Sequence, residues 1–176
     1  ELIGRLRDAV PKMVLQVGGS ISFAPEPGAE TAKWQTYDTR HMLTELDPKP
    51  DQVTVAIGSS LYDMSPLTNL DDLKGTHLAN PQMVHALSNM VADSTPDFYV
   101  EHLKRLEKAK IQPYFALATV HQVQIVERLI RQGVYKGPMN GFFSMVGGGV
   151  AGSNPIDWME LIRRTPHGSV FTYQTM

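Results

Sequence analysis

The sequence predicts an α/β fold, a (β/α)8 barrel of the TIM type, of which this chain covers about five consecutive βα units. The first observation is a repeated order in the second half of the chain: an apolar run, a small or polar residue, an amphipathic helical stretch, and a Gly or Pro turn. The second is that no early strand is followed by a G-x-G-x-x-G fingerprint or a P-loop, as a doubly wound nucleotide-binding sheet would require. Because a parallel barrel carries its chemistry in the loops after its strands, a site is expected in those loops.

Five strands are predicted, at roughly 13–18, 52–58, 111–118, 139–145 and 168–174. Helices are predicted at 1–9, within 38–46, near 82–90, after Thr95 and Pro96, from about 120 to 132, and after Asn154 and Pro155. Prolines and a glycine interrupt the pattern between 61 and 93, which we interpret as an enlarged βα loop or insertion within one partial barrel domain, 1–176. A closed barrel needs eight strands. The other units are therefore expected to lie outside these residues, to have been cleaved, or to come from another chain, since open sheet edges favour aggregation.

The composition is that of an ordinary globular chain and limits the classes of function. The 176 residues carry a net charge of -2 and are 42% hydrophobic, with no apolar run long enough to span a bilayer and no signal-peptide pattern. No basic run points to a nucleic-acid or membrane partner. Cysteine is absent, which excludes disulfides, thiolate metal ligands and cysteine nucleophiles, and we expect a cytoplasmic protein.

A series of short motifs follows in a characteristic order along most of the chain. The series reads Gln16-Val17-Gly18-Gly19, Arg40, Gly58-Ser59-Ser60, Ile111-Gln112-Pro113, Leu129-Ile130-Arg131-Gln132-Gly133 with Gly137-Pro138, Gly147-Gly148-Gly149, and Pro166-His167-Gly168-Ser169-Val170-Phe171. In order and spacing it resembles the β-keto acid cleavage enzyme family, that of the 3-keto-5-aminohexanoate cleavage enzyme. The resemblance excludes about 61–88, where this sequence carries an insertion.

The resemblance implies a full barrel that binds zinc or another divalent metal and condenses a small β-keto acid with acetyl-CoA, giving acetoacetate and a new CoA ester. The metal would act as a Lewis acid on the keto oxygen. In the family it is held by a His-x-His pair on an early strand and by a Glu in a Gly-x-Glu-Asp segment on a late one. Neither motif occurs here, so no metal ligand is expected within this chain. The expected partners are the keto acid, the CoA thioester, and either further copies in a homo-oligomer or a complementing chain.

Two departures from the family pattern leave a second interpretation open. Family members commonly have Pro-Glu-x-Glu where this chain reads Pro113-Tyr114-Phe115-Ala116, and an Asp where it has Thr119. A carboxylate there is expected to take part in proton transfer. The Ser-Thr-Gly-Gly of many relatives reads Gln16-Val17-Gly18-Gly19, which removes hydroxyls. Either the substrate differs, or the chain is a non-catalytic barrel relative that acts as a binding or assembly subunit. A Schiff-base aldolase is not indicated, because no lysine lies in a predicted strand.

The candidate binding residues directly follow predicted strands. Substrate binding is assigned to Gly18, Gly19, Ser20, Ser59 and Ser60. The acyl-CoA is assigned to the backbone of Gly147, Gly148 and Gly149. The alternatives are ordinary turn chemistry for the serines and a flexible turn for the glycines.

Histidines give one catalytic candidate. His121 follows the strand at 111–118 and could act as an acid or base, whereas the alternative is a solvent-exposed histidine in the first turn of a helix. His41, beside Arg40, is expected at the surface, and the remaining histidines show no spacing typical of metal ligands. Since all loops after parallel strands emerge at one rim, we expect a ligand to contact at least two of the segments that follow strands. These segments contain Gly18 to Ser20, Ser59 and Ser60, Thr119 to His121, and Gly147 to Gly149.

Overall fold

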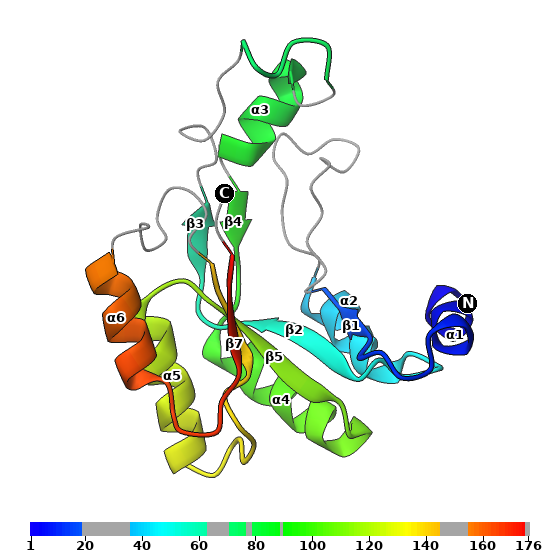
Figure 1. Cartoon of the computed structure of the whole chain (residues 1–176), viewed down its shortest axis with the longest axis vertical. Helices are drawn as coiled ribbons and strands as arrows, with labels where there is room; N and C mark the ends of the chain where they lie inside the picture. The colour runs from blue at the N-terminus through cyan, green and yellow to red at the C-terminus, as the bar shows by residue number, and fades with distance from the viewer. Residues whose placement is uncertain (19–35, 63–70, 77–78, 89, 145–154, 175–176) are drawn as a thin grey trace.

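The computed structural model describes residues 1–18, 36–62, 71–76, 79–88, 90–144 and 155–174. Within them one parallel sheet contains β1 (Gln16–Val17), β2 (Gln52–Ala56), β5 (Gln112–Leu117), β6 (Gly141–Ser144) and β7 (Phe171–Gln174). The strands lie side by side in chain order, and the sheet curls as an open half-barrel (Figure 1). A doubly wound sheet would reverse its order at a switch point. The five predicted parallel strands are confirmed, and their order is compatible with a partial barrel.

Helices precede the strands at the predicted places. They are α1 (Leu2–Ala9), α2 (Tyr37–His41) with the 3-10 helix η1 (Met42–Glu45), α4 (Pro96–Ala109), α5 (Val120–Arg131) and α6 (Pro155–Arg164). Thr95 and Pro96 open α4 as expected. A capping box opens α5, because the Thr119 hydroxyl accepts from the Gln122 N–H and the Gln122 side chain accepts from the Thr119 N–H. The predicted cap Asn154 lies outside the described residues. Among the helices described, none has the length and apolar character needed to cross a membrane.

The stretch between β2 and α4 contains elements that the sequence did not predict. β3 (Ser60–Tyr62) and β4 (Met90–Ala92) pair as an antiparallel ribbon, separate from the parallel sheet. The predicted helix near 82–90 is α3 (Pro81–Ser88). Figure 1 shows the ribbon and α3 projecting beyond the sheet. The ribbon matters for the site, because β4 returns the chain to the end of β2 immediately before α4 begins.

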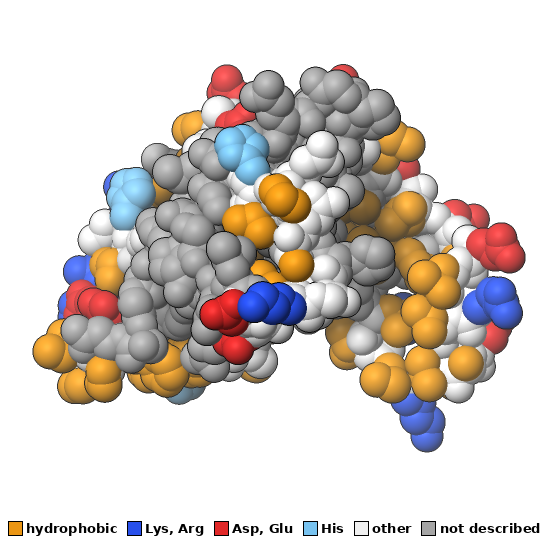
Figure 2. Space-filling model, turned by 90° about the horizontal axis from the view of Figure 1, so that it is seen from above, with side chains coloured by type: hydrophobic (Ala, Val, Ile, Leu, Met, Phe, Trp, Pro, Cys, Tyr) orange, Lys and Arg blue, Asp and Glu red, His pale blue; other side chains and the backbone are white. Residues whose placement is uncertain are grey.

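Exposed hydrophobic side chains gather at the two ends of the described structure (Figure 2). They include Leu2, Leu6, Met13 and Val14 near the β1 edge, and Ile156, Met159 and Ile162 on α6 near the β7 edge. In the described residues β1 pairs only with β2, and β7 only with β6. The apolar surfaces thus flank the two edges that a closed barrel would pair.

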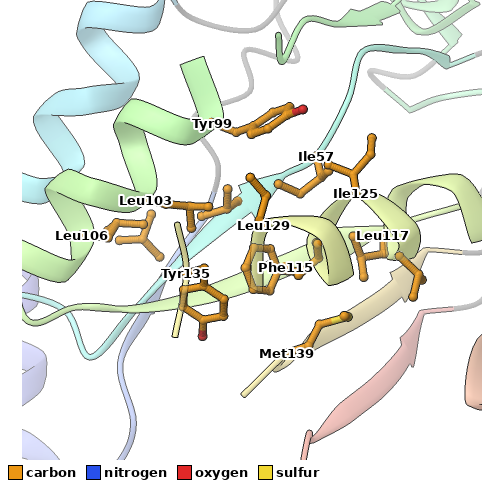
Figure 3. Packing of buried hydrophobic residues seen from close by; sticks show 14 of the residues in the cluster. Ile57, Tyr99, Leu103, Leu106, Phe115, Leu117, Ile125, Leu129, Tyr135 and Met139 are labelled. Atoms are coloured by element: carbon orange, nitrogen blue, oxygen red, sulfur yellow. The ribbon is translucent and has the colours of Figure 1, made fainter. Parts of the chain in front are cut away.

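The hydrophobic core lies between one face of the sheet and helices α4 and α5. Side chains alternate between the two faces of a strand, and every second residue of β2 and β5 points into this core. The core includes Val53, Val55, Ile57, Phe115 and Leu117 from the sheet, and Leu103, Leu106, Val126 and Leu129 from the helices. Figure 3 shows Leu103 and Leu106 on α4 and Leu129 on α5 packing towards Phe115. This packing fixes β2 and β5 against their helices and so fixes the ends of both strands.

The opposite face of the sheet carries polar and aromatic side chains that bond across strands. The Gln16 amide donates to Thr54 Oγ1 at 2.7 Å, and the Tyr114 hydroxyl lies 2.9 Å from Thr172 Oγ1. The Tyr114 ring also stacks on Phe142, with ring centroids 5.8 Å apart. In a barrel this face forms the interior, where side chains from neighbouring strands fill the space.

Candidate functional site

The parallel order places the loops after the strands at one edge of the sheet. Gly18 follows β1, Gly58 and Ser59 follow β2, and Thr119 follows β5. Among the predicted site residues, Gly19, Ser20, Gly147, Gly148 and Gly149 lie outside the described residues, and the side chain of Ser60 is not described. Their assignment to substrate and to acyl-CoA stays a prediction. The described part of this carboxyl edge is formed by the ends of β2 and β5 and by the start of α4.

A cluster of three polar residues closes the end of β2. The Ser59 hydroxyl donates to Asp93 Oδ1 at 3.1 Å and accepts from the Ser94 N–H at 3.0 Å. The Ser94 hydroxyl donates to the carbonyl of Ala56, the last residue of β2, at 2.7 Å. Gly58 has a φ of 77°, a left-handed conformation that suits glycine and lets the chain turn out of the strand before Ser59. Ser59 and Asp93 are exposed, whereas Ser94 is buried, so the cluster presents one hydroxyl and one carboxylate to solvent.

Arg40 holds this cluster in place through hydrogen bonds to Asp93 and Ser94. The residue is only 3% exposed, and its guanidinium donates to the Asp93 carbonyl at 2.6 Å and, more weakly, to Ser94 Oγ at 3.4 Å. It also lies over the Phe98 ring, 3.7 Å from the centroid, a favourable cation–π geometry. Burial lowers the pKa of Arg40 from its ordinary value to about 10, and Tyr37 and Asp93 partly oppose that shift. The side chain therefore remains a cation at neutral pH and fixes the backbone on which Asp93 is carried.

His41 is buried against α4, so its predicted surface position is wrong. It is 6% exposed, and its Nδ1 lies 3.1 Å from Nδ1 of His102, which is 2% exposed. One ring must donate and the other accept, so at least one of the two is neutral. Burial, followed by the charges of His41 and Arg40, lowers the pKa of His102 to about 3, and burial also lowers the pKa of His41. The sequence could not show this burial, because the five-residue α2 is too short for a reliable apolar period.

His121 and Thr119 lie at the carboxyl edge in the positions expected from sequence. His121 is exposed in the first turn of α5, so its geometry fits the catalytic candidate and the solvent-exposed alternative equally. The Thr119 hydroxyl is engaged as the cap of α5. On β5, Tyr114 and Ala116 point to the barrel-interior face and carry no carboxylate. In the described part of this edge, Asp93 is the carboxylate that bonds to a residue following a strand of the sheet.

A cavity of about 650 Å3 lies at the opposite edge, near the starts of β2 and β5. Its lining includes Lys49, Asp51, Gln112 and Lys136. Asp51 accepts from the Leu15 N–H and pairs with Arg7 at 2.8 Å, contacts that hold its pKa below the usual range. The amino edge of a parallel barrel serves stability rather than chemistry. We therefore place the candidate site at the carboxyl edge, despite the cavity at the other end.

Comparison with known proteins gives one result that spans the chain. The family model described as beta-keto acid cleavage enzyme matches residues 1–175. No curated protein matches the sequence. The match covers the described sheet, the helices and the candidate site together.

Proposed function

The chain belongs to the beta-keto acid cleavage enzyme family, and from this premise we propose that the complete protein condenses a small β-keto acid with acetyl-CoA, giving acetoacetate and a new CoA ester. The observation that carries the proposal is the family match over residues 1–175. The parallel sheet supports it, because its common carboxyl edge is the location at which a barrel enzyme binds substrates.

The residues assigned to each substrate remain part of this proposal. The keto acid carboxylate would lie near Ser59, with Ser60, Gly18, Gly19 and Ser20 as further contacts. The Ser59 hydroxyl donates to Asp93 in the structure and would turn to the ligand on binding, because a hydroxyl has one proton to donate. The acyl-CoA would lie against the backbone at 147–149, since glycines allow a phosphate to approach main-chain N–H groups closely. His121 would serve as an acid or base at the same edge.

The family resemblance implies a divalent metal, but the described residues do not fit one. They contain no group of three or more His, Asp or Glu side chains that could hold a metal ion. The buried His41–His102 pair does not fit either, because the guanidinium of Arg40 stands beside it and would repel a divalent cation. We therefore propose that zinc or another divalent metal binds outside the described residues.

The proposed partners besides the substrates are further copies of the chain or a complementing chain. The apolar surfaces at the β1 and β7 edges support this part of the proposal, since an exposed sheet edge rarely stays unpaired. A cytoplasmic location is also proposed, since a chain without cysteine is compatible with a reducing compartment.

The test is an activity assay of the full-length protein, supplied with divalent metal, on a panel of β-keto acids with apolar, cationic and anionic side chains. Acetoacetate is measured by mass spectrometry in the presence of acetyl-CoA. We expect acetoacetate from at least one keto acid. A folded, metal-loaded protein that gives none across the panel would overturn the proposal.

Calorimetry on a double variant tests the assigned carboxylate site. Replacing Ser59 and Ser60 by Ala should weaken keto acid binding by about 1–3 kcal/mol, the cost of losing a hydrogen bond to a charged group, or roughly 5- to 160-fold in affinity. Thr165→Ala is the matched control, because its hydroxyl donates to the Leu161 carbonyl at the end of α6, away from the carboxyl edge. Unchanged affinity in the double variant would remove both serines from the site.

A non-catalytic binding or assembly subunit is the second candidate function. The observation in its favour is that Tyr114 and Ala116 supply no carboxylate, while the Tyr114 hydroxyl is bonded to Thr172. Keto acid binding without any turnover, measured on the same samples, would favour it.

A further inference from the structure

We propose that three side chains of the barrel interior, Tyr114, Ala116 and Phe142, set the substrate class, and that this class is β-keto acids with an uncharged, apolar or aromatic side chain. The inference rests on the proposed function, because it names which keto acids the proposed reaction takes and which residues contact their side chains.

The first argument is that the interior face of the sheet is uncharged in two rows that cross its strands. Register partners on neighbouring parallel strands point to the same face. The side chains of these rows are Thr54 with Tyr114, and Ala56, Ala116, Phe142 and Thr172. None of the six carries a charge. A charged substituent would therefore meet no counter-ion on this wall, and burying an unpaired charge is costly, whereas burying an apolar group is favourable.

The second argument is that this wall is accessible and has an apolar surface between small and aromatic side chains. Ala116 lies between Ala56 on β2 and Phe142 on β6 in the same row, and it projects a single methyl group. The Tyr114 hydroxyl lies 2.9 Å from Thr172 Oγ1 on β7, so the tyrosine extends away from β2, and its ring stacks on Phe142. Tyr114, Ala116 and Phe142 are each only partly buried. An apolar group placed against Ala116 would have the two stacked rings beside it.

The third argument is the position of this wall relative to the proposed carboxylate site. Ala56, the register partner of Ala116, accepts through its carbonyl from the Ser94 hydroxyl, and the Ser94 N–H donates to Ser59. The carboxylate and the side chain of a β-keto acid lie at opposite ends of a short molecule. With the carboxylate held at Ser59, the side chain extends into the barrel along Ala116.

The first experiment compares three keto acids of the same chain length. The full-length, metal-loaded protein receives acetyl-CoA with 3-oxohexanoate, 5-amino-3-oxohexanoate or 3-oxoadipate, whose side chains are uncharged, cationic and anionic. Initial rates of acetoacetate formation give kcat/KM, and calorimetry gives the affinities. We expect 3-oxohexanoate to be preferred over both charged acids by at least about tenfold, within the range by which one changed group alters selection in a pocket.

The outcomes distinguish this inference from the proposed function. An equal or greater preference for a charged keto acid overturns the inference and leaves the proposed function standing. Binding without turnover overturns the proposed function, and the measured affinities then test the same ranking. A folded protein that neither binds nor converts any of the acids overturns both.

The second experiment changes the wall itself. Ala116→Glu should shift the ratio of the kcat/KM values for 3-oxohexanoate and 5-amino-3-oxohexanoate at least about tenfold towards the cationic acid. Gln132→Glu is the matched control, because it adds the same charge at an exposed position at the end of α5, at the amino edge. It should leave the ratio unchanged.

Ala116→Leu tests the space beside the rings without adding a charge. It should lower kcat/KM for 3-oxo-3-phenylpropanoate at least about tenfold more than for the smaller 3-oxopentanoate, whereas a general structural defect would lower both alike. Parent ratios in both Ala116 variants, with native circular dichroism spectra, would overturn the inference. The ranking of keto acids by the parent protein tests it independently of how the variants fold.

Discussion

Replacing Arg40 by Met is expected to destabilise the fold by about 2–4 kcal/mol, because several contacts of one buried cation are lost together. Hydrogen bonds from a charged donor contribute about 1.5–3 kcal/mol, and Arg40 donates at 2.6 Å to the Asp93 carbonyl. A desolvated cation–π contact adds up to about 2 kcal/mol, and the guanidinium lies 3.7 Å from the Phe98 centroid. The Met side chain recovers part of this by filling the space with apolar contacts.

Urea denaturation of the full-length protein, followed by circular dichroism, measures the free energy of unfolding and the m-value. Arg131→Met is the matched control, since Arg131 is exposed at the end of α5 and surface changes usually stay within about 0.5 kcal/mol. A loss below about 1 kcal/mol for Arg40→Met, with an unchanged m-value, would refute the view that this cation anchors the loop that returns from β4. The same variant should retain keto acid binding less well than the control, because the Asp93 backbone loses its support.

Two further predictions concern stability. The free energy of unfolding should fall as the pH is lowered from about 6.5 towards 3, because His102 takes up a proton in the unfolded chain but stays neutral in the fold, where its pKa is lowered to about 3. Denaturation at several pH values should give a slope that approaches about 1.4 kcal/mol per pH unit. The slope should be smaller in His102→Gln. Gly141→Ala should lower the free energy of unfolding by about 2 kcal/mol or more in thermal denaturation, because the new Cβ would meet the Phe115 carbonyl of β5. Gly4→Ala, where the new methyl group would only touch Pro48 at 3.6 Å, should be neutral or stabilising. An equal loss of stability in both variants would contradict this packing of β6 on β5.

The parallel sheet could be predicted from sequence because its strands carry long apolar runs closed by small residues. The ends of the strands were less predictable. The strand predicted at 13–18 is reduced to Gln16–Val17. Among the described residues it pairs with β2 alone, and Met13 and Val14 are exposed. The strand predicted at 139–145 begins at Gly141, the first residue with a register partner on β5. The first and last residues of a strand depend on which neighbouring strand is hydrogen-bonded to it, and a single sequence does not show that pairing directly.

The Ser59–Asp93–Ser94 cluster could be predicted only in part. The predicted strand at 52–58 places Ser59 at the carboxyl edge, whereas Asp93 lies at the end of the stretch interpreted as an enlarged loop, before the predicted helix start at Thr95 and Pro96. The missing information was the β3–β4 ribbon, whose two three-residue strands are too short to show a period of two. The ribbon brings Ser59 into hydrogen-bond contact with Asp93 and Ser94, which lie 34 and 35 positions further along the sequence. A long-range cluster built by a ribbon of this size leaves almost no local signal.

The side chains inside the half-barrel show what occupies the positions at which carboxylates are missing from β5. Tyr114 bonds to Thr172 and stacks on Phe142, so three neighbouring strands are joined by side chains that satisfy one another. A carboxylate at position 114 would have to be solvated or paired in that interior, and the tyrosine instead contributes to packing. The cluster at the end of β2 is different, because its carboxylate is exposed while the atoms that position it are buried. Within the described residues the interior positions of β5 are thus filled by Tyr114 and Ala116, whereas the cluster at the end of β2 presents the carboxylate of Asp93 to solvent.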